Sequence, residues 1–191
     1  ESKADLAFTM HMLSYLSTKG TAAIVEFPGV LYRGGAEQKI RKYIVESNFV
    51  DTVIQLPSDL FFGTSIATCI LVLKKSKKTN DILFIDASNE FVRNTNKNKL
   101  TNPEDNNVDN ILKLIRNRTN IENKSIVVSN EEVANNNYNI SVNSYLKCFI
   151  EEDKINIKEV NKKIVEVVKR ESEIRIELDK IIQGLEEDFN E

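Results

Sequence analysis

Two adjacent aromatic side chains beside a glycine form the first group in this sequence that could act on a ligand. Phe61 and Phe62 precede Gly63, in a segment that begins at Pro57 and lies between two apolar runs. Pro57 and Gly63 predict a loop, which would lie at a sheet edge. In that loop an aromatic ring could stack on a flat ligand, or it could simply cap the hydrophobic core. The residues alone leave both roles open.

A second candidate is an anion site at a glycine pair. Gly34 and Gly35 precede a segment with helical periodicity, and backbone N–H groups at a helix start attract anions. A tight turn beside an ordinary solvated basic face is the alternative. The candidates for contact with a phosphate backbone lie in this turn, on the expected outer face of the helix and in a later polar segment: Arg33, Lys39, Arg41, Lys97 and Lys99.

Other residue types with catalytic or metal-binding chemistry are scattered. His11 lies beside the apolar stripe of an expected helix, and Asp86 ends an apolar segment where a turn-forming role is expected. Cys69 and Cys148 are about 80 residues apart without a CxxC spacing, which predicts two buried, reduced thiols. The sequence contains no glycine-rich phosphate loop, no Ser/His/Asp set and no short element with paired acids. The residues alone therefore predict no catalytic centre and no metal site.

The composition is that of an ordinary cytoplasmic protein. The chain has 191 residues, a net charge of -3, 41% hydrophobic and 29% charged residues. No apolar run reaches the roughly 18 residues needed to span a bilayer, and the first residues lack the pattern of a signal peptide. The acidic balance does not favour nucleic-acid binding by bulk charge, so any such contact would come from local basic clusters.

The first half of the chain predicts an α/β sheet. Helices are expected at residues 4–18 and 36–46, and strands at 21–27, 49–56, 66–73 and 81–87. The strand at 21–27 has the small and β-branched residues of a central strand, and the apolar run at 66–73 predicts a strand buried on both faces. A link of about eight residues joins the strands at 49–56 and 66–73, which allows an antiparallel pair at the edge of the sheet.

The second half begins with a polar segment at 89–107 that is expected to be an exposed loop. A helix at 108–118, a strand at 125–128, a helical turn at 130–135 and an extended segment at 138–145 follow.

The last stretch predicts one long helix. Residues 151–190 lack proline, and one side carries apolar residues three and four positions apart, with Glu171 as the interruption. A helix of about 35 residues is about 50 Å long, so one side needs a partner outside the globular part unless it packs back along its own domain. This heptad seam consists of Ile157, Val160, Ile164, Val167, Ile174, Leu178, Ile181 and Leu185.

Several short segments carry a resemblance to a known family. They are 4–8 (Ala-Asp-Leu-Ala-Phe), 29–37 (Gly-Val-Leu-Tyr-Arg-Gly-Gly-Ala-Glu), 60–64 (Leu-Phe-Phe-Gly-Thr), 69–72, 84–88 and 138–140. In order and spacing, over roughly residues 4–146, they resemble the modification subunit of type I restriction-modification systems, an adenine-N6 DNA methyltransferase. The resemblance implies the C-terminal half of a Rossmann-like S-adenosylmethionine-dependent methyltransferase sheet, mixed with antiparallel edge strands, plus a long C-terminal α-helix.

The resemblance also implies roles for three parts of the chain. Residues 1–88 would be the C-terminal half of the methyltransferase domain, 89–150 a loop-rich extension, and 151–191 a helix that docks the specificity subunit. Phe61 or Phe62 would stack on the flipped adenine. Double-stranded DNA and a restriction subunit would join the assembled complex, and the helix alone could pair with a second copy.

One departure from the family limits what this chain is expected to do by itself. The family's glycine-containing cofactor loop and Asn-Pro-Pro-Phe/Tyr motif do not occur in this sequence and are expected to precede it. We therefore expect no catalytic residue, no bound S-adenosylmethionine and no turnover from the chain alone. The alternatives are a non-enzymatic module for helix-mediated assembly and a related methyltransferase that acts on RNA or protein.

Overall fold

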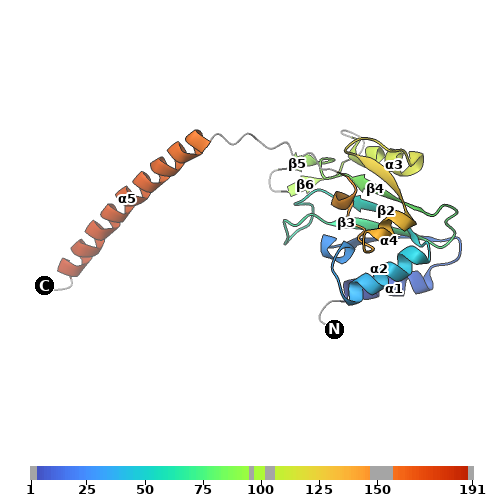
Figure 1. Cartoon of the computed structure of the whole chain (residues 1–191). Coiled ribbons are helices and arrows are strands. Elements are labelled where there is room, and N and C mark those ends of the chain that lie inside the picture. Colours follow the sequence, from blue (N-terminus) through green and yellow to red (C-terminus); the bar gives the residue numbers. More distant parts are fainter. Residues whose placement is uncertain (1–3, 95–96, 102–105, 147–156, 189–191) are drawn as a thin grey trace. The chain divides into compact units, whose positions relative to one another are not determined.

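The chain divides into two units, Glu1–Phe149 and Ile150–Glu191. The computed structural model describes residues 4–94, 97–101, 106–146 and 157–188 (Figure 1). The first unit contains a sheet with helices on both faces, and the second contains one long helix. The predicted α/β class with a C-terminal helix is confirmed.

A five-stranded mixed sheet forms the centre of the first unit. Its strands are β1 (Thr21–Glu26), β2 (Val50–Gln55), β3 (Cys69–Lys74), β4 (Asp81–Asp86) and β7 (Ser125–Ser129). Their spatial order is β1-β3-β2-β4-β7. The β2 and β4 strands run parallel, and the other neighbours run antiparallel.

Two expectations about this sheet are wrong. The strand expected to be central, β1, is an edge strand of the described sheet, and β3 lies between β1 and β2 rather than at the edge. The antiparallel pairing of β2 with β3 is confirmed. β3 is buried on one face and half-buried on the other, rather than buried on both faces as expected, whereas β1 exposes three of its six residues. The apolar run of β3 indicated an interior strand, but it did not indicate which strands would be its neighbours.

Side chains alternate between the two faces of the sheet and create two core clusters. Val53 and Phe84 face a cluster that α1 (Asp5–Tyr15), α2 (Ala36–Glu46) and the 3-10 helices η1 (Pro28–Leu31) and η2 (Val142–Ser144) help to form. Their sequence neighbours Ile54, Leu83 and Ile85 face a second cluster, which Ile111 of α3 (Asn107–Asn117) covers. Figure 1 shows α3 on one side of the sheet and α1 and α2 on the other.

The orientation of α2 corrects a predicted site residue. Arg41 was expected on the outer face, but its side chain is only 1% exposed, whereas Tyr43, expected inside, is 50% exposed. The Arg41 guanidinium donates through Nε to the Tyr138 carbonyl (2.8 Å), through Nη1 to Val30 (2.8 Å) and through Nη2 to Arg33 (2.6 Å). Because it is buried and bonded to three carbonyl groups, Arg41 does not contact a phosphate backbone.

Two polar segments are more structured than the sequence indicated. Residues 92–99 were expected in an exposed loop but include the hairpin of β5 (Val92–Asn94) and β6 (Lys97–Lys99). The segment expected to be extended at 138–145 instead contains η2. There the Tyr145 hydroxyl donates to the Asn139 carbonyl (2.6 Å), and the Asn139 side chain accepts from the Ser141 N–H (2.9 Å). These local hydrogen bonds favour a turn over an extended strand. The short helix α4 (Asn130–Asn135) occurs where a helical turn was expected.

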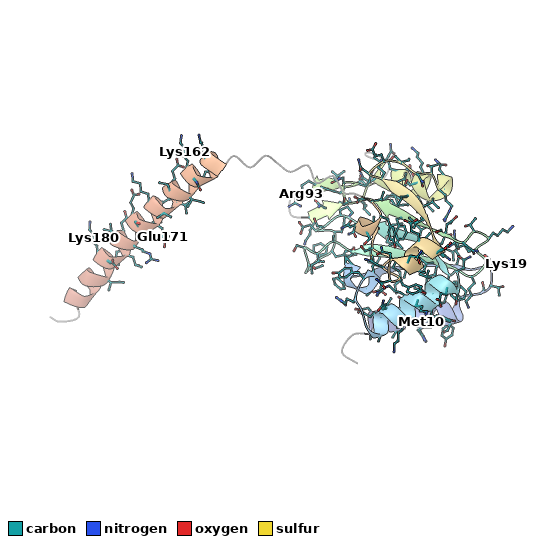
Figure 2. All side chains as sticks on the ribbon, in the orientation of Figure 1. Met10, Lys19, Arg93, Lys162, Glu171 and Lys180 are labelled. Carbon is teal, nitrogen blue, oxygen red and sulfur yellow. The ribbon has the colours of Figure 1, made fainter. Side chains whose placement is uncertain are left out.

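The long C-terminal helix is confirmed as α5 (Ile157–Asp188). Polar side chains such as Lys162, Glu171 and Lys180 project from it (Figure 2). Its apolar residues are also exposed: Ile164, Val167, Ile174, Leu178 and Ile181 of the seam are between 53% and 66% exposed. The side chains of Ile157, Val160 and Leu185 lie outside those described. Within the described ranges, no helix has the length and apolar character needed to cross a membrane.

Candidate functional site

The loop between β2 and β3 presents two aromatic side chains at the end of the sheet. It spans residues 56–68 and is longer than expected, because β3 begins at Cys69 and Ile66 is 58% exposed. Asp59 (φ 57°) and Gly63 (φ 80°) have left-handed backbone conformations on either side of the aromatic pair. Phe61 is 42% exposed and Phe62 is 95% exposed. Core capping is therefore excluded for Phe62.

Phe61 forms one wall of an open cleft of about 280 Å³. The cleft lies where α1, the end of β1 and the aromatic loop meet. Its lining combines aromatic and aliphatic carbon with carboxylate and hydroxyl groups: Asp5, Val25, Glu26, Phe27, Phe61, Thr64 and Thr68.

The polar groups of this cleft are partly shielded from water. Glu26 is 8% exposed and accepts a hydrogen bond from Thr9 Oγ1 at 2.8 Å. Burial raises the pKa of the Glu26 carboxyl, and the hydrogen bond from Thr9 opposes that rise. Thr68 is 5% exposed, and its Oγ1 has no hydrogen-bond partner among the described residues. A flat apolar wall beside polar atoms suits a planar ligand whose edge forms hydrogen bonds.

The glycine pair before α2 forms a turn, and the positive charge of the neighbouring Arg33 is balanced by two carboxylates. Gly35 has a φ of 72° and precedes the first residue of the helix. Arg33 lies 3.9 Å from Asp5 and 3.5 Å from Glu37, measured from Nη1 to the nearest carboxylate oxygens. Those two carboxylates would repel a phosphate group that approached Arg33. The geometry therefore favours the turn over the anion site.

The remaining basic candidates differ in what they contact. Lys39 and Lys99 are exposed on α2 and β6. Lys97 Nζ instead donates to the Thr64 carbonyl at 3.1 Å and lies 3.6 Å from the Asp59 carboxylate. Lys97 thus contacts the aromatic loop.

The scattered reactive residues have structural surroundings. Cys69 is buried and free, as expected. Burial raises the pKa of its thiol to about 12, which disfavours the reactive thiolate. The Asp86 carboxylate accepts a hydrogen bond from the Ser88 N–H at 2.9 Å, as the predicted turn role requires. His11 is exposed and lies edge-on to Tyr15. Cys148 lies outside the described residues, and those residues include no group of three metal-ligating side chains.

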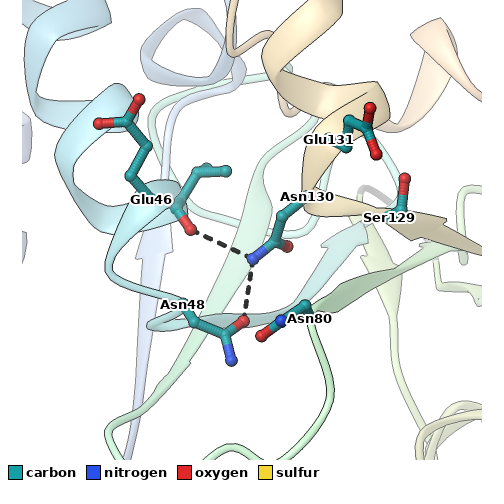
Figure 3. A pocket seen from close by; sticks show the side chains of 7 residues that line it. Glu46, Asn48, Asn80, Ser129, Asn130 and Glu131 are labelled. Carbon is teal, nitrogen blue, oxygen red and sulfur yellow. Dashed lines mark hydrogen bonds between the residues drawn. The ribbon is translucent and has the colours of Figure 1, made fainter.

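A second cleft, of about 430 Å³, lies where three turns meet (Figure 3). Asn130 Nδ2 donates to the Val45 carbonyl (3.2 Å) and to Asn48 Oδ1 (2.9 Å). Sequence reasoning missed this cleft because its residues come from segments far apart in the chain. The amide contacts join the end of α2 to the start of α4, which is a structural role.

Comparisons with known proteins agree on one family. The N-6 DNA Methylase family model matches residues 1–154. The type I restriction enzyme MpnII methylase subunit of Mycoplasma pneumoniae is 46% identical over 190 residues, which cover 99% of this chain and 34% of that protein. The chain thus spans about a third of the length of the curated relatives it matches.

Solved structures also match this chain. A crystal structure of the type I restriction-modification methyltransferase subunit from Streptococcus thermophilus aligns with a TM-score of 0.73 and 41% identity, over 76% of this chain and 31% of that one. A structure described as a type I R-M system aligns over 96% of this chain and 40% of that one, with a TM-score of 0.61 and 19% identity, which shows a common fold.

Proposed function

This chain belongs to the N-6 DNA methylase family, and we propose that it is the part of a type I modification subunit that receives the target adenine and docks the specificity subunit. The observation that carries this proposal is the 46% identity to a type I methylase subunit across 99% of the chain. A chain that served only for assembly would need similarity in its helix, not across the whole sheet.

The aromatic loop and its cleft are the proposed base site. Base flipping delivers an adenine that needs an aromatic face for stacking and polar atoms for its edge. Phe61 supplies a half-exposed face, and Thr68 and Glu26 supply buried polar atoms in the same cleft. We assign the stacking role to Phe61 because it lines the cleft, with Phe62 beside it as a second exposed ring. Lys39 and Lys99 are the proposed contacts to the DNA backbone.

S-adenosylmethionine is the proposed methyl donor of the complete subunit. The glycine turn at 34–35 offers no unpaired cation for the carboxylate of this cofactor, because Asp5 and Glu37 already match the charge of the neighbouring Arg33. The family's cofactor loop and Asn-Pro-Pro-Phe/Tyr motif do not occur in this sequence. We therefore assign cofactor binding and the transfer of the methyl group to the rest of the subunit, and expect the chain alone to be inactive.

A methylation assay tests the proposed activity. The full-length subunit, assembled with its specificity subunit, should transfer labelled methyl groups from S-adenosylmethionine to double-stranded DNA. Nucleoside analysis by mass spectrometry should identify the product as N6-methyladenine. Label found only in RNA or protein would favour the related methyltransferase, and a stable assembly with no methyl transfer would favour the assembly module.

The exposed seam of α5 is the proposed docking surface for the specificity subunit, with a restriction subunit joining the same system. Its support is an apolar heptad pattern whose described side chains are more than half exposed. In the absence of that partner, the seam is proposed to pair with a second copy of itself.

Replacing Ile174 by aspartate should weaken binding of the specificity subunit by about a hundredfold or more, because it inserts a charge into the apolar seam. Ile176→Asp is the matched control, since Ile176 is as exposed as Ile174 (56%) but lies off the seam. Its affinity should stay within about threefold of wild type. Titration calorimetry would measure both affinities. Equal losses in the two variants would contradict docking through the seam.

A further inference from the structure

The β5–β6 hairpin is fastened to the aromatic loop by a buried amide. Asn98 is 6% exposed although it lies in a short, polar strand. Its Nδ2 donates to the Ser58 carbonyl at 2.9 Å, and its backbone N–H donates to the Asp59 carbonyl at 3.0 Å. One residue of the hairpin therefore binds two successive carbonyl groups of the loop, just before Phe61.

Charged side chains of the hairpin hold the loop at further points. Lys97 Nζ donates to the Thr64 carbonyl (3.1 Å) and lies 3.6 Å from the Asp59 carboxylate. Arg93 Nη1 lies 3.5 Å from the same carboxylate and donates to Asn98 Oδ1 at 3.0 Å. Asp59 has a left-handed backbone, which aspartate tolerates better than most residues, and these contacts help to hold it there. The contacts are made to residues on both sides of the aromatic pair.

The rings themselves receive little support from packing. Phe62 is 95% exposed and Phe61 is 42% exposed, so the core does not fix their positions. The core anchors the loop at Leu56 and Leu60 rather than at the rings. Between these anchors and β3 the loop has its own hydrogen bonds, from the Asp59 N–H to Ser65 and from the Ile66 N–H to Thr64 Oγ1. The hairpin adds the contacts to the Ser58, Asp59 and Thr64 carbonyl groups and to the Asp59 carboxylate. A ring held in position before the ligand arrives avoids the entropic cost of ordering it at that moment.

We propose that the β5–β6 hairpin is a positioning element that holds the aromatic loop in the conformation that receives the target base, with Asn98 and Lys97 as the positioning residues. This inference rests on the proposed function, because it assigns the loop a base to receive. It gives Lys97 a role in the geometry of the site instead of the role in DNA-backbone binding that the sequence indicated.

The test combines kinetics of the full-length, assembled methyltransferase with hydrogen exchange on the 191-residue chain. Asn98→Ala and Lys97→Met should each lower kcat by about tenfold or more, because small displacements of a positioned group reduce turnover strongly. The KM for DNA should change by less than about threefold. Amide exchange in residues 58–66 should become faster in both variants, and Lys97→Arg should restore much of the lost kcat.

Lys99→Met is the matched comparison, because it removes the same charge from an exposed position of the same hairpin. As a proposed DNA-backbone contact, Lys99 should affect KM and its salt dependence and leave kcat nearly unchanged. If Lys97→Met behaves like Lys99→Met, with a raised KM, a weaker salt dependence and an unchanged kcat, Lys97 binds phosphate and the proposal is overturned. Unchanged loop exchange, or faster exchange with unchanged kcat, would also overturn it. Failure of the proposed base site would give a different result. Phe61→Ala would then leave methylation unchanged, whether or not amide exchange in the loop becomes faster in the hairpin variants.

Discussion

Replacing Arg41 by methionine is expected to lower the free energy of unfolding of the first unit by about 4 kcal/mol. The guanidinium is 1% exposed and donates to the carbonyl groups of Val30, Arg33 and Tyr138. Methionine fills part of the volume but leaves three acceptors without their donors. Those acceptors belong to η1, the turn before α2 and the segment after α4. Without the three hydrogen bonds, these segments would pack less firmly against one face of the sheet.

Tyrosine emission during urea unfolding would measure this change. All five tyrosines lie before residue 150 and the chain has no tryptophan, so the signal reports the first unit without a contribution from α5. Lys39→Met is the matched control: it removes the same charge from an exposed position of the same helix, and its effect should stay within about 0.5 kcal/mol. Arg41→Lys should be intermediate, because one ammonium group cannot reach three diverging carbonyls. A loss below about 1 kcal/mol in Arg41→Met would contradict the structural role.

Arg41 also illustrates where sequence reasoning stops. Periodicity identified the helix at 36–46 with its bounds, but it treated an arginine as a surface residue. The three carbonyl groups that make its burial favourable come from residues 30, 33 and 138. No local sequence pattern indicates that these groups meet at the Arg41 guanidinium. The available signal for its burial was its spacing, because Arg41 lies three positions before the buried Ile44 on the same helix.

The sheet shows the same division between local and long-range information. The strand segments were predictable because apolar runs and turn residues are local properties. The place of β3 between β1 and β2 depends on pairing across more than 40 residues, from Glu26 to Cys69. The hairpin at 92–99 was hidden for a related reason: its polar residues indicate an exposed loop unless one knows that Asn98 binds the backbone of Ser58.

The aromatic pair was accessible from the sequence because a loop with two neighbouring phenylalanines is unusual without a ligand or a core to cover. The structure excludes the core for Phe62 and leaves Phe61 half-exposed in the cleft. Sequence reasoning missed the polar side of that cleft. Glu26 ends β1 and Thr68 directly precedes β3, 42 positions later, and the two line one cleft because β1 pairs with β3.

Phe61→Ala in the full-length, assembled methyltransferase should lower kcat/KM for DNA by about tenfold to a hundredfold. A base stacked on an aromatic ring gains about 1 to 3 kcal/mol, and 1.36 kcal/mol corresponds to a factor of ten in rate. Stability should change by less than about 1 kcal/mol because the ring is 42% exposed. Phe61→Trp keeps an aromatic face and should retain most of the activity, which separates stacking from a general loss of apolar surface.

A control variant and a variant of the second ring show whether Phe61 or Phe62 receives the base. Ile66→Ala removes an exposed apolar side chain from the same loop and should leave kcat/KM within about twofold of wild type. Phe62→Ala should have a smaller effect than Phe61→Ala, because Phe62 is not part of the cleft lining. The reverse order would transfer the stacking role to Phe62 and separate it from the polar atoms of Glu26 and Thr68. If neither Phe61→Ala nor Phe62→Ala slows methylation, the loop does not receive the base, and the buried Thr68 hydroxyl, which has no hydrogen-bond partner among the described residues, has no role in base binding.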